Sequence, residues 1–243
     1  TSTGGDTTIK AGAYSSSQTG KSYEINLGGA GKNTLELTSI SGKSAADRLS
    51  ISLGADAATA DQTLTVRGAV KNLDLTGSNA KEVITIEGAV SGSSFALKGG
   101  NDTFDAVKNA KGQNLSNTSI TSTAGNTTVT AGSYSGTSAN EISLQGSGTN
   151  TVKLTAVSGK GNKTDADRAV IKLEGTATLE VSGTVKNLNY TGGDGKDTIK
   201  IIGSRVTNSR FPLGDGGNLF QAGREYDGAG TLSAKGAALS GVE

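Results

Sequence analysis

The sequence predicts an all-β protein and, within that class, a β-solenoid (a parallel β-helix or β-roll) in two tandem repeats. Three observations support this fold class. Apolar and polar residues alternate in many short segments, a glycine follows several of these segments, and the second half of the chain repeats the first. Two tandem β-sandwich domains are the alternative, because turn signals that recur about every 8–12 residues also fit a sandwich.

The repeat covers most of the chain. The segment TSTGGDTTIKAGAYS at 1–15 matches TSTAGNTTVTAGSYS at 121–135, and a second long match relates residues 24–43 to 141–160. Further matches follow in the same order, so we assign residues 1–120 to a first β repeat unit and residues 121–243 to a second. The units differ in length only in runs of Gly, Ser, Ala and Asp, which indicates loops.

The segments between these loops alternate apolar and polar residues, which predicts strands. They are 24–27, 33–40, 48–53, 62–68, 72–77, 83–88 and 93–99 in the first unit, and 141–144, 150–157, 169–173, 178–183, 187–192, 198–203 and 209–214 in the second. We expect about eight short strands in each unit. Glycines directly after strands, as at Gly68 and Gly88, and an aromatic content of only 4% favour the solenoid over the sandwich.

Composition excludes several classes of function. The chain has 23 Lys and Arg against 22 Asp and Glu without a basic run, so we expect no nucleic-acid partner. No apolar run approaches the ~18 residues of a membrane span. The lack of His and Cys excludes Ser-His-Asp and Cys-His catalysis and zinc sites built on those ligands, whereas carboxylate-based carbohydrate chemistry stays open.

The segment GGDGKD at 192–197 is the first candidate calcium site. Calcium takes about six to eight oxygen ligands, and Asp194 and Asp197 offer carboxylates in a glycine-rich turn whose carbonyls can point inward. A plain turn is the alternative interpretation, and Lys196 favours it because its charge opposes a cation. The equivalent stretch of the first unit, GSNAKE at 77–82, keeps a single carboxylate.

A second candidate calcium site lies in KGGNDTFDA at 98–106 and in its counterpart GDGGNLF at 214–220. The oxygen-bearing side chains there are Asn101, Asp102 and Asp105 in the first unit, and Asp215 and Asn218 in the second. The alternative is again a turn, in which Asp and Asn tolerate left-handed backbone.

Four segments share the pattern Gly-x-Gly-x-Asn/Asp-Thr-aliphatic-x-aliphatic: GAGKNTLEL at 29–37, GSGTNTVKL at 146–154, GDGKDTIKI at 193–201 and, less completely, GGNDTF at 99–104. This pattern resembles the glycine-rich nonapeptide of RTX-type secreted proteins and the strand-turn repeats of bacterial S-layer proteins and surface adhesins. The resemblance implies an extracellular protein of the bacterial cell surface that self-associates into a homopolymer or array, with calcium as cofactor. The long tandem run of nonapeptides typical of an RTX roll is missing from this sequence.

We therefore expect a non-enzymatic structural protein: a protomer of an S-layer, sheath or filament, or a repeat of an adhesin. The large tandem repeat and the lack of a catalytic signature support this hypothesis. The alternatives are a polysaccharide-degrading β-helix enzyme and a carbohydrate-binding module with a surface glycan as partner. Thr1 matches Thr121, so the chain begins in register with the repeat, which suits a unit of a longer array or an assembly whose ends meet.

Overall fold

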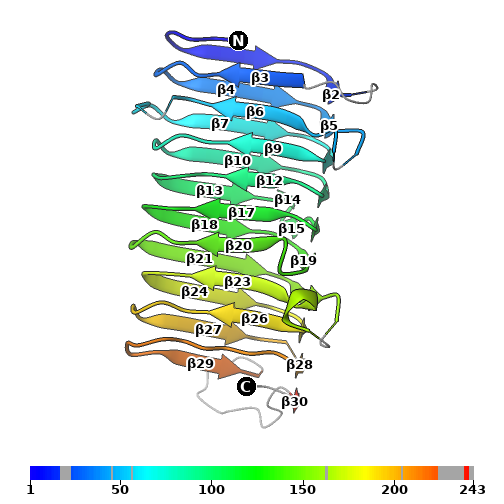
Figure 1. The fold of residues 1–243 in the computed structure, drawn as a ribbon, viewed down its shortest axis with the longest axis vertical. Coiled ribbons are helices and arrows are strands. Elements are labelled where there is room, and N and C mark those ends of the chain that lie inside the picture. The colour runs from blue at the N-terminus through cyan, green and yellow to red at the C-terminus, as the bar shows by residue number, and fades with distance from the viewer. Residues whose placement is uncertain are drawn as a thin grey trace.

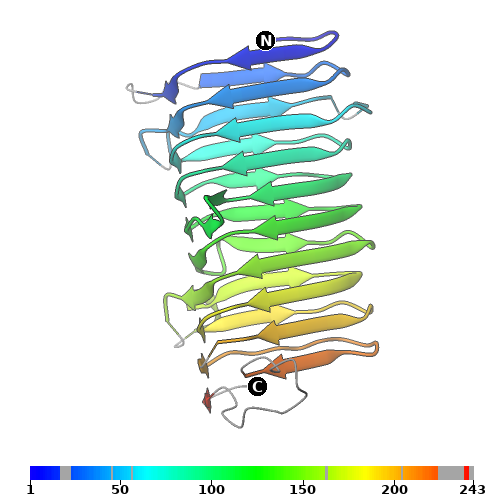
Figure 2. The same ribbon diagram turned by 180° about the vertical axis from the view of Figure 1, so that it is seen from behind.

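The computed structural model is a rod in which three parallel β-sheets wind around one core (Figure 1). It describes the chain apart from residues 17–22, 45, 56, 162–163, 204, 224–237 and 241–243. The first strands lie at one end of the rod and the last at the other, and the view from behind has the same regular stacking (Figure 2). The prediction of a β-solenoid is confirmed, with about nine turns between the first and the last of the ten strands of its first sheet.

One circuit of the chain, here called a rung, adds one strand to each of three sheets, except that the last two rungs add none to the third sheet within the described residues. In order along the rod, the first sheet contains β1 (Thr7–Lys10), β4 (Asn33–Leu37), β7 (Gln62–Val66), β10 (Glu82–Ile86), β13 (Asn101–Asp105), β18 (Asn126–Thr130), β21 (Thr149–Leu154), β24 (Thr176–Val181), β27 (Asp197–Ile201) and β29 (Leu219–Ala222).

The second sheet is built from short strands: β2 (Ala13–Ser15), β5 (Ser39–Ser41), β8 (Val70–Lys71), β11 (Val90–Ser91), β16 (Leu115–Ser116), β19 (Ser133–Gly136), β22 (Ala156–Gly159), β25 (Val185–Lys186), β28 (Arg205–Thr207) and β30 (Ala238–Ser240). The third sheet contains β3 (Tyr23–Leu27), β6 (Leu49–Leu53), β9 (Leu73–Thr76), β12 (Ser94–Ala96), β17 (Ser119–Ser122), β20 (Glu141–Leu144), β23 (Ala169–Leu173) and β26 (Leu188–Thr191).

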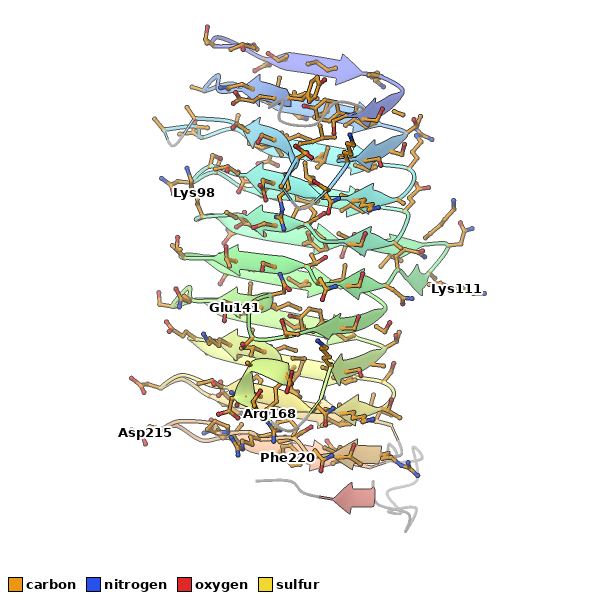
Figure 3. All side chains as sticks on the ribbon, turned by 45° about the vertical axis from the view of Figure 1, so that its right-hand side comes forward. Lys98, Lys111, Glu141, Arg168, Asp215 and Phe220 are labelled. Carbon is orange, nitrogen blue, oxygen red and sulfur yellow. The ribbon has the colours of Figure 1, made fainter. Side chains whose placement is uncertain are left out.

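Two insertions interrupt this regular path. An antiparallel hairpin of β14 (Val107–Lys108) and β15 (Lys111–Gly112) follows β13, and Figure 3 shows Lys111 projecting from the rod there. A loop with the 3-10 helix η1 (Asp165–Asp167) precedes β23. Both lie outside the stacked strands, and the loop before β23 is one of the segments whose length differs between the units.

The core is a set of columns in which equivalent residues of successive rungs stack. Strand alternation turns every second residue of the first sheet inward, and the parallel register places these side chains directly above one another. One column runs through Ile9, Leu35, Leu64, Ile84, Phe104, Val129, Val152, Leu179, Ile199 and Phe220. All its members are buried except Ile9 and Phe220, which lie at the two ends.

The expected number of about eight strands per unit was wrong, because each rung contains three strands. The second sheet accounts for the difference. Its strands β8 and β11 are only two residues long, so they are too short to form an alternating pattern that could be recognised in the sequence.

The corner between the second and third sheets depends on left-handed backbone. Asn72, Asn117, Asn187 and Asn208 occupy this corner in different rungs with φ angles between 45° and 53°. Asn is among the few side chains that adopt this conformation readily. At the corner between the third and first sheets, Gly125 also has a left-handed backbone conformation, with a φ angle of 78°. A Cβ atom at this position would lie only 1.6 Å from the Gly100 carbonyl oxygen.

The two repeat units are five rungs each of a single rod. The first unit contributes β1, β4, β7, β10 and β13 to the first sheet, and the second unit contributes β18, β21, β24, β27 and β29. The boundary at residue 120 lies inside β17, and all three sheets pass it with continuous parallel pairing. A five-rung unit therefore packs directly onto a copy of itself.

Candidate functional site

The most distinctive polar feature of the interior is a column at the head of the first-sheet strands, here called the polar ladder. In register along the rod it contains Asn33, Gln62, Glu82, Asp102, Thr127, Asn150, Ala177, Asp197 and Asn218. Every polar member from Asn33 to Asp197 is buried, with at most 2% of its surface exposed. A buried polar side chain is costly unless it has hydrogen-bond partners, so each member needs an explanation.

The amide members of the polar ladder hold the turns together. The Asn33 Nδ2 donates to the Leu27 carbonyl oxygen at 3.0 Å and to Gln62 Oε1 of the next rung at 2.7 Å. The equivalent Asn150 donates at 2.7 Å to the carbonyl oxygens of both Gly146 and Glu174. These bonds tie the amide side chains to carbonyl groups of the turns, and the Leu27 carbonyl oxygen also accepts from the Gly54 N–H at 2.9 Å.

Two carboxyl groups, Glu82 and Asp102, lie on adjacent rungs of the ladder. Glu82 Oε1 accepts hydrogen bonds from the Ser78 N–H at 2.9 Å and the Ser78 hydroxyl at 2.5 Å. Asp102 Oδ1 accepts one from the Glu82 N–H at 2.9 Å. The second oxygens, Glu82 Oε2 and Asp102 Oδ2, are buried without a hydrogen-bond partner in the described structure.

Burial raises the pKa of both carboxyl groups well above their usual range. The negative charge of Asp102 adds to the rise at Glu82, whereas the hydrogen bonds from Ser78 oppose it. The Glu82 N–H opposes the rise at Asp102. The interior has low polarity, so it disfavours a charged carboxylate and raises its pKa. A second carboxylate nearby adds charge repulsion and raises the pKa further.

The second unit has a different arrangement at the equivalent rungs. Asp197 corresponds to Glu82, and neither of its carboxyl oxygens has a hydrogen-bond partner among the described residues. Burial raises the pKa of Asp197 to about 6, and the neighbouring Tyr190 hydroxyl opposes the rise. The carboxyl group packs tightly against Gly192, where a Cβ atom would lie 1.7 Å from Asp197 Oδ2. Glycine is therefore needed there because of this close approach.

The seven residues predicted to bind calcium are distributed over different faces. Asp102 and Asp197 point into the core, whereas Asn101, Asp194 and Asp215 are exposed on or next to turns. Asp105 lies on the outer face of β13, and Asn218 is half-buried. Figure 3 shows Asp215 at the outer edge of its turn.

The structure joins only some of these residues. The Asp197 N–H donates to Asn218 Oδ1 at 2.8 Å, and Asn218 Nδ2 donates to the Gly214 carbonyl oxygen at 3.1 Å. Asn101 Oδ1 accepts from Asn126 at 2.8 Å. Within the described residues no group of three or more acidic side chains is placed to hold a metal ion. Calcium binding by Asp194 or Asp215 stays a prediction.

Sequence reasoning missed Glu82, Asn33 and Asn150 as members of one buried column. The signal was present in the first residue of the strands NTLEL, QTLTV, EVITI, NTVKL and DTIKI, where Asn, Gln, Glu or Asp precedes an alternating segment. When one strand is considered alone, this first polar residue is interpreted as part of the preceding turn. Only the register between rungs identifies it as the start of an inward column.

The outer face of the first sheet carries a row of threonines. In register these are Thr8, Thr34, Thr63, Thr103, Thr128, Thr151, Thr178 and Thr198, and Val83 and Leu219 occupy the other two positions of the column. Neighbouring members are separated by ~4.8 Å, the spacing between strands. The row is thus a flat and regular set of hydroxyl groups on the surface.

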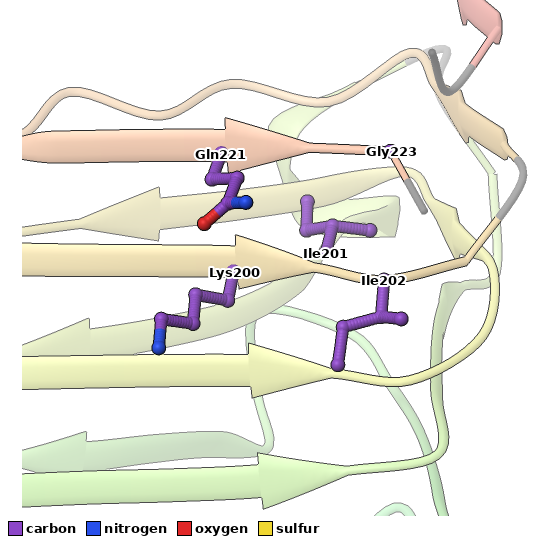
Figure 4. Close-up of a pocket in the computed structure, with 5 residues that line it drawn as sticks. All are labelled: Lys200, Ile201, Ile202, Gln221 and Gly223. Atoms are coloured by element: carbon purple, nitrogen blue, oxygen red, sulfur yellow. The ribbon is translucent and has the colours of Figure 1, made fainter. Parts of the chain in front are cut away.

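A small pocket lies at the last rungs of the first sheet (Figure 4). It is lined by Lys200, Ile201, Ile202, Gln221 and Gly223 and has a volume of about 50 Å³. Ligand sites for small molecules have volumes of about 300–1,000 Å³. This pocket has room for only a few water molecules.

Comparison of the chain with protein families, with curated proteins and with solved structures finds no match. Among the described residues, no helix has the length and apolar character needed to span a membrane.

Proposed function

We propose that this protein is a non-enzymatic structural component of the bacterial cell surface, outside the cell, in which the solenoid is a self-associating rod. It would serve as a protomer of an S-layer, sheath or filament, or as a repeat of an adhesin. One observation carries the proposal: a five-rung unit packs on a copy of itself at the β13–β18 boundary with unbroken register. A unit with this property can extend an array by repeating one contact.

Calcium is included in the proposal as a stabilising ion between turns. Asp194 and Asp215 support this, because they are exposed carboxylates on turns that belong to successive rungs. A bound ion that recognises only the folded state at about 100 times its dissociation constant would stabilise the protein by ~2.7 kcal/mol. Thermal unfolding with calcium and with a chelator measures this term, and the double variant Asp194→Asn/Asp215→Asn should abolish any difference.

Electron microscopy and light scattering of the purified chain test the structural role. We expect ordered filaments or sheets whose formation depends on protein concentration. Strictly monomeric protein with and without calcium would overturn self-association. Release of oligosaccharides from a panel of acidic polysaccharides would overturn the non-enzymatic assignment.

Carbohydrate binding is the second candidate, and the threonine row favours it. A flat array of hydroxyl groups offers repeated hydrogen bonds to an extended glycan. Saturable binding on a glycan array would support this function if Thr128→Arg, in the middle of the row, abolishes it. Ser158→Arg, on the exposed face of β22 in the second sheet, is the matched control and should leave binding unchanged.

A further inference from the structure

The first sheet ends in two strands that each have an internal counterpart. β1 is the terminal strand at one end, and its sequence equivalent in the second unit is β18. Among the described residues β29 is the terminal strand at the other end, and its equivalent in the first unit is β13. β13 and β18 pair with each other inside the rod, so the chain already contains the contact that its two ends could make.

The internal contact has a defined register. Asp102 is opposite Thr127, Thr103 opposite Thr128, and Phe104 opposite Val129. Replacing each residue by its counterpart in the other unit places Asn218 opposite Thr7, Leu219 opposite Thr8, and Phe220 opposite Ile9. Each of these pairs has a polarity compatible with a parallel ladder, and no pair brings like charges together.

Apolar side chains at the β1 end are less buried than their internal counterparts. Val129, Tyr134 and Ile142 are fully buried because a rung of the first unit covers them. Their equivalents in the first rung are Ile9, Tyr14 and Ile25, which are only partly buried. The first rung therefore has an apolar end surface of the kind that is covered at the internal boundary.

The β29 end has the complementary property. Phe95, Leu97 and Phe104 of the first unit are fully buried, whereas their equivalents Phe211, Leu213 and Phe220 are only partly buried. The strands themselves also favour addition of another strand. Neither β1 (TTIK) nor β29 (LFQA) contains the proline that commonly blocks pairing at a sheet edge.

We propose that copies of this chain associate head to tail, with β29 of one copy pairing in parallel with β1 of the next in the register of the internal β13–β18 contact. This inference rests on the proposed self-association and specifies its partner and interface. Phe220 of one copy would stack on Ile9 of the next, as Phe104 stacks on Val129. The two contacting surfaces differ, so the association repeats without closing into a dimer and produces a filament along the rod axis.

Cysteine cross-linking tests the register directly, because the wild-type chain has no cysteine. In the variant Thr8→Cys/Leu219→Cys, the two side chains face outward and would be opposite one another between copies. Residues in register on neighbouring parallel strands have Cα atoms ~4.8 Å apart, within the range of a disulfide. Within one chain they lie on opposite ends of a ten-stranded sheet, more than about 40 Å apart, so no internal bond can form.

We expect oxidation to convert this variant into a ladder of covalent oligomers. The matched control is Thr8→Cys/Gln221→Cys, in which the cysteines are displaced by two residues and ~8 Å apart, so cross-linking should be largely lost. If filaments form but the first variant cross-links no better than the control, the register is wrong while self-association stands. Efficient cross-linking of Thr8→Cys to itself would overturn the head-to-tail arrangement in favour of a symmetric one.

A proline substitution tests whether β1 provides the edge. The N–H groups of Thr7 and Ala11 donate to β4 or the residues that flank it, so strand alternation turns the Thr8 N–H toward the open edge. Thr8→Pro removes this donor, and we expect loss of filaments with an unchanged circular dichroism spectrum. Thr8→Val keeps the donor and should assemble as the wild type does. Filaments of undiminished length from Thr8→Pro would overturn the interface.

Discussion

The two units place an acidic residue at the same point of the polar ladder but surround it differently. In the first unit, Glu82 stacks on the acid Asp102 and accepts two hydrogen bonds from Ser78. In the second, Asp197 stacks on the amide Asn218 and lies next to Tyr190. The backbone contact is nevertheless the same, since the N–H of each acid donates to the side-chain oxygen of the next rung at 2.8–2.9 Å.

A side-chain acceptor is not needed at the head of every strand, since the N–H groups of Gln62 and Ala177 donate to the backbone carbonyl oxygens of Lys81 and Lys196. At Glu82 and Asp197 the acceptor is a side-chain oxygen of the next rung, a carboxyl oxygen in the first unit and an amide oxygen in the second. The acceptor satisfies a backbone N–H that would otherwise be buried without a partner. An amide fulfils the same role as a carboxylate and also donates to the turn, as Asn218 does to Gly214. Among the described residues each arrangement leaves two buried carboxyl oxygens without a hydrogen-bond partner: Glu82 Oε2 and Asp102 Oδ2 in the first unit, and both oxygens of Asp197 in the second.

Truncation of a core phenylalanine should give the largest difference between the units. Phe104 and Phe220 are equivalent, and each makes an edge-on contact with another ring. The ring centroids are 4.8 Å apart for Phe104 and Phe95, and 4.9 Å apart for Phe220 and Phe211. Phe104→Ala should lower the free energy of unfolding by about 3–5 kcal/mol because it leaves a cavity inside the rod. Phe220→Ala should cost only about 1–2 kcal/mol because that side chain is partly exposed at the rod end.

Urea unfolding of both variants, at concentrations where the protein is monomeric, measures these values. Equal losses would show that the end rung is as well packed as the interior. They would also remove the main argument for an apolar end surface that needs a partner.

Exchange of the ladder residues should change how stability depends on pH. A carboxyl group whose pKa is raised by folding stabilises the protein fully below the unfolded-state pKa, and this stability is lost as the pH rises through the folded-state value. The free energy of unfolding should therefore fall from pH 4 toward pH 8 in the wild type. Asp102→Asn gives the first unit the acid–amide stack of the second, and should raise stability at pH 8 by about 1–3 kcal/mol.

The reciprocal variant Asn218→Asp serves as the control for this exchange. It creates an acid–acid stack in the second unit and should steepen the decline of stability with pH. Denaturant titrations at several pH values give the slopes. If Asp102→Asn leaves the slope unchanged, Glu82 and Asp102 do not titrate as a raised pair.

A surface ion pair should contribute least. Lys172 and Glu141 form a salt bridge at 2.8 Å in the second unit, whereas Ser52 occupies the place of Lys172 in the first. Lys172→Ser should change the free energy of unfolding by about 0–1 kcal/mol, because exposed pairs are weakened by solvent and side-chain entropy. Thermal unfolding in low and high salt measures this change. A loss above this range would mean that the pair positions β23 or β20.

Much of the fold was predictable because its strands are marked by a local alternation of apolar and polar residues. Alternation in segments such as LSISL predicted strands such as β6, and the match between the two halves predicted a repeated unit. The two-residue strand β8 was not predictable, since Val70 and Lys71 become a strand only by pairing with neighbouring rungs. The predicted calcium residues illustrate the same limit. Asp102 and Asp105 are close in sequence, but strand alternation turns one inward and the other outward.

The sequence by itself determined the all-β class, the division into two repeat units and the positions of many turns, because alternation and glycine placement act over a few residues. Only the tertiary structure decided which polar residues are buried together. Glu82 and Asp102 are 20 positions apart, and one turn of the solenoid brings them onto adjacent rungs. Their environment depends on the length of that turn, a long-range property that no local pattern contains.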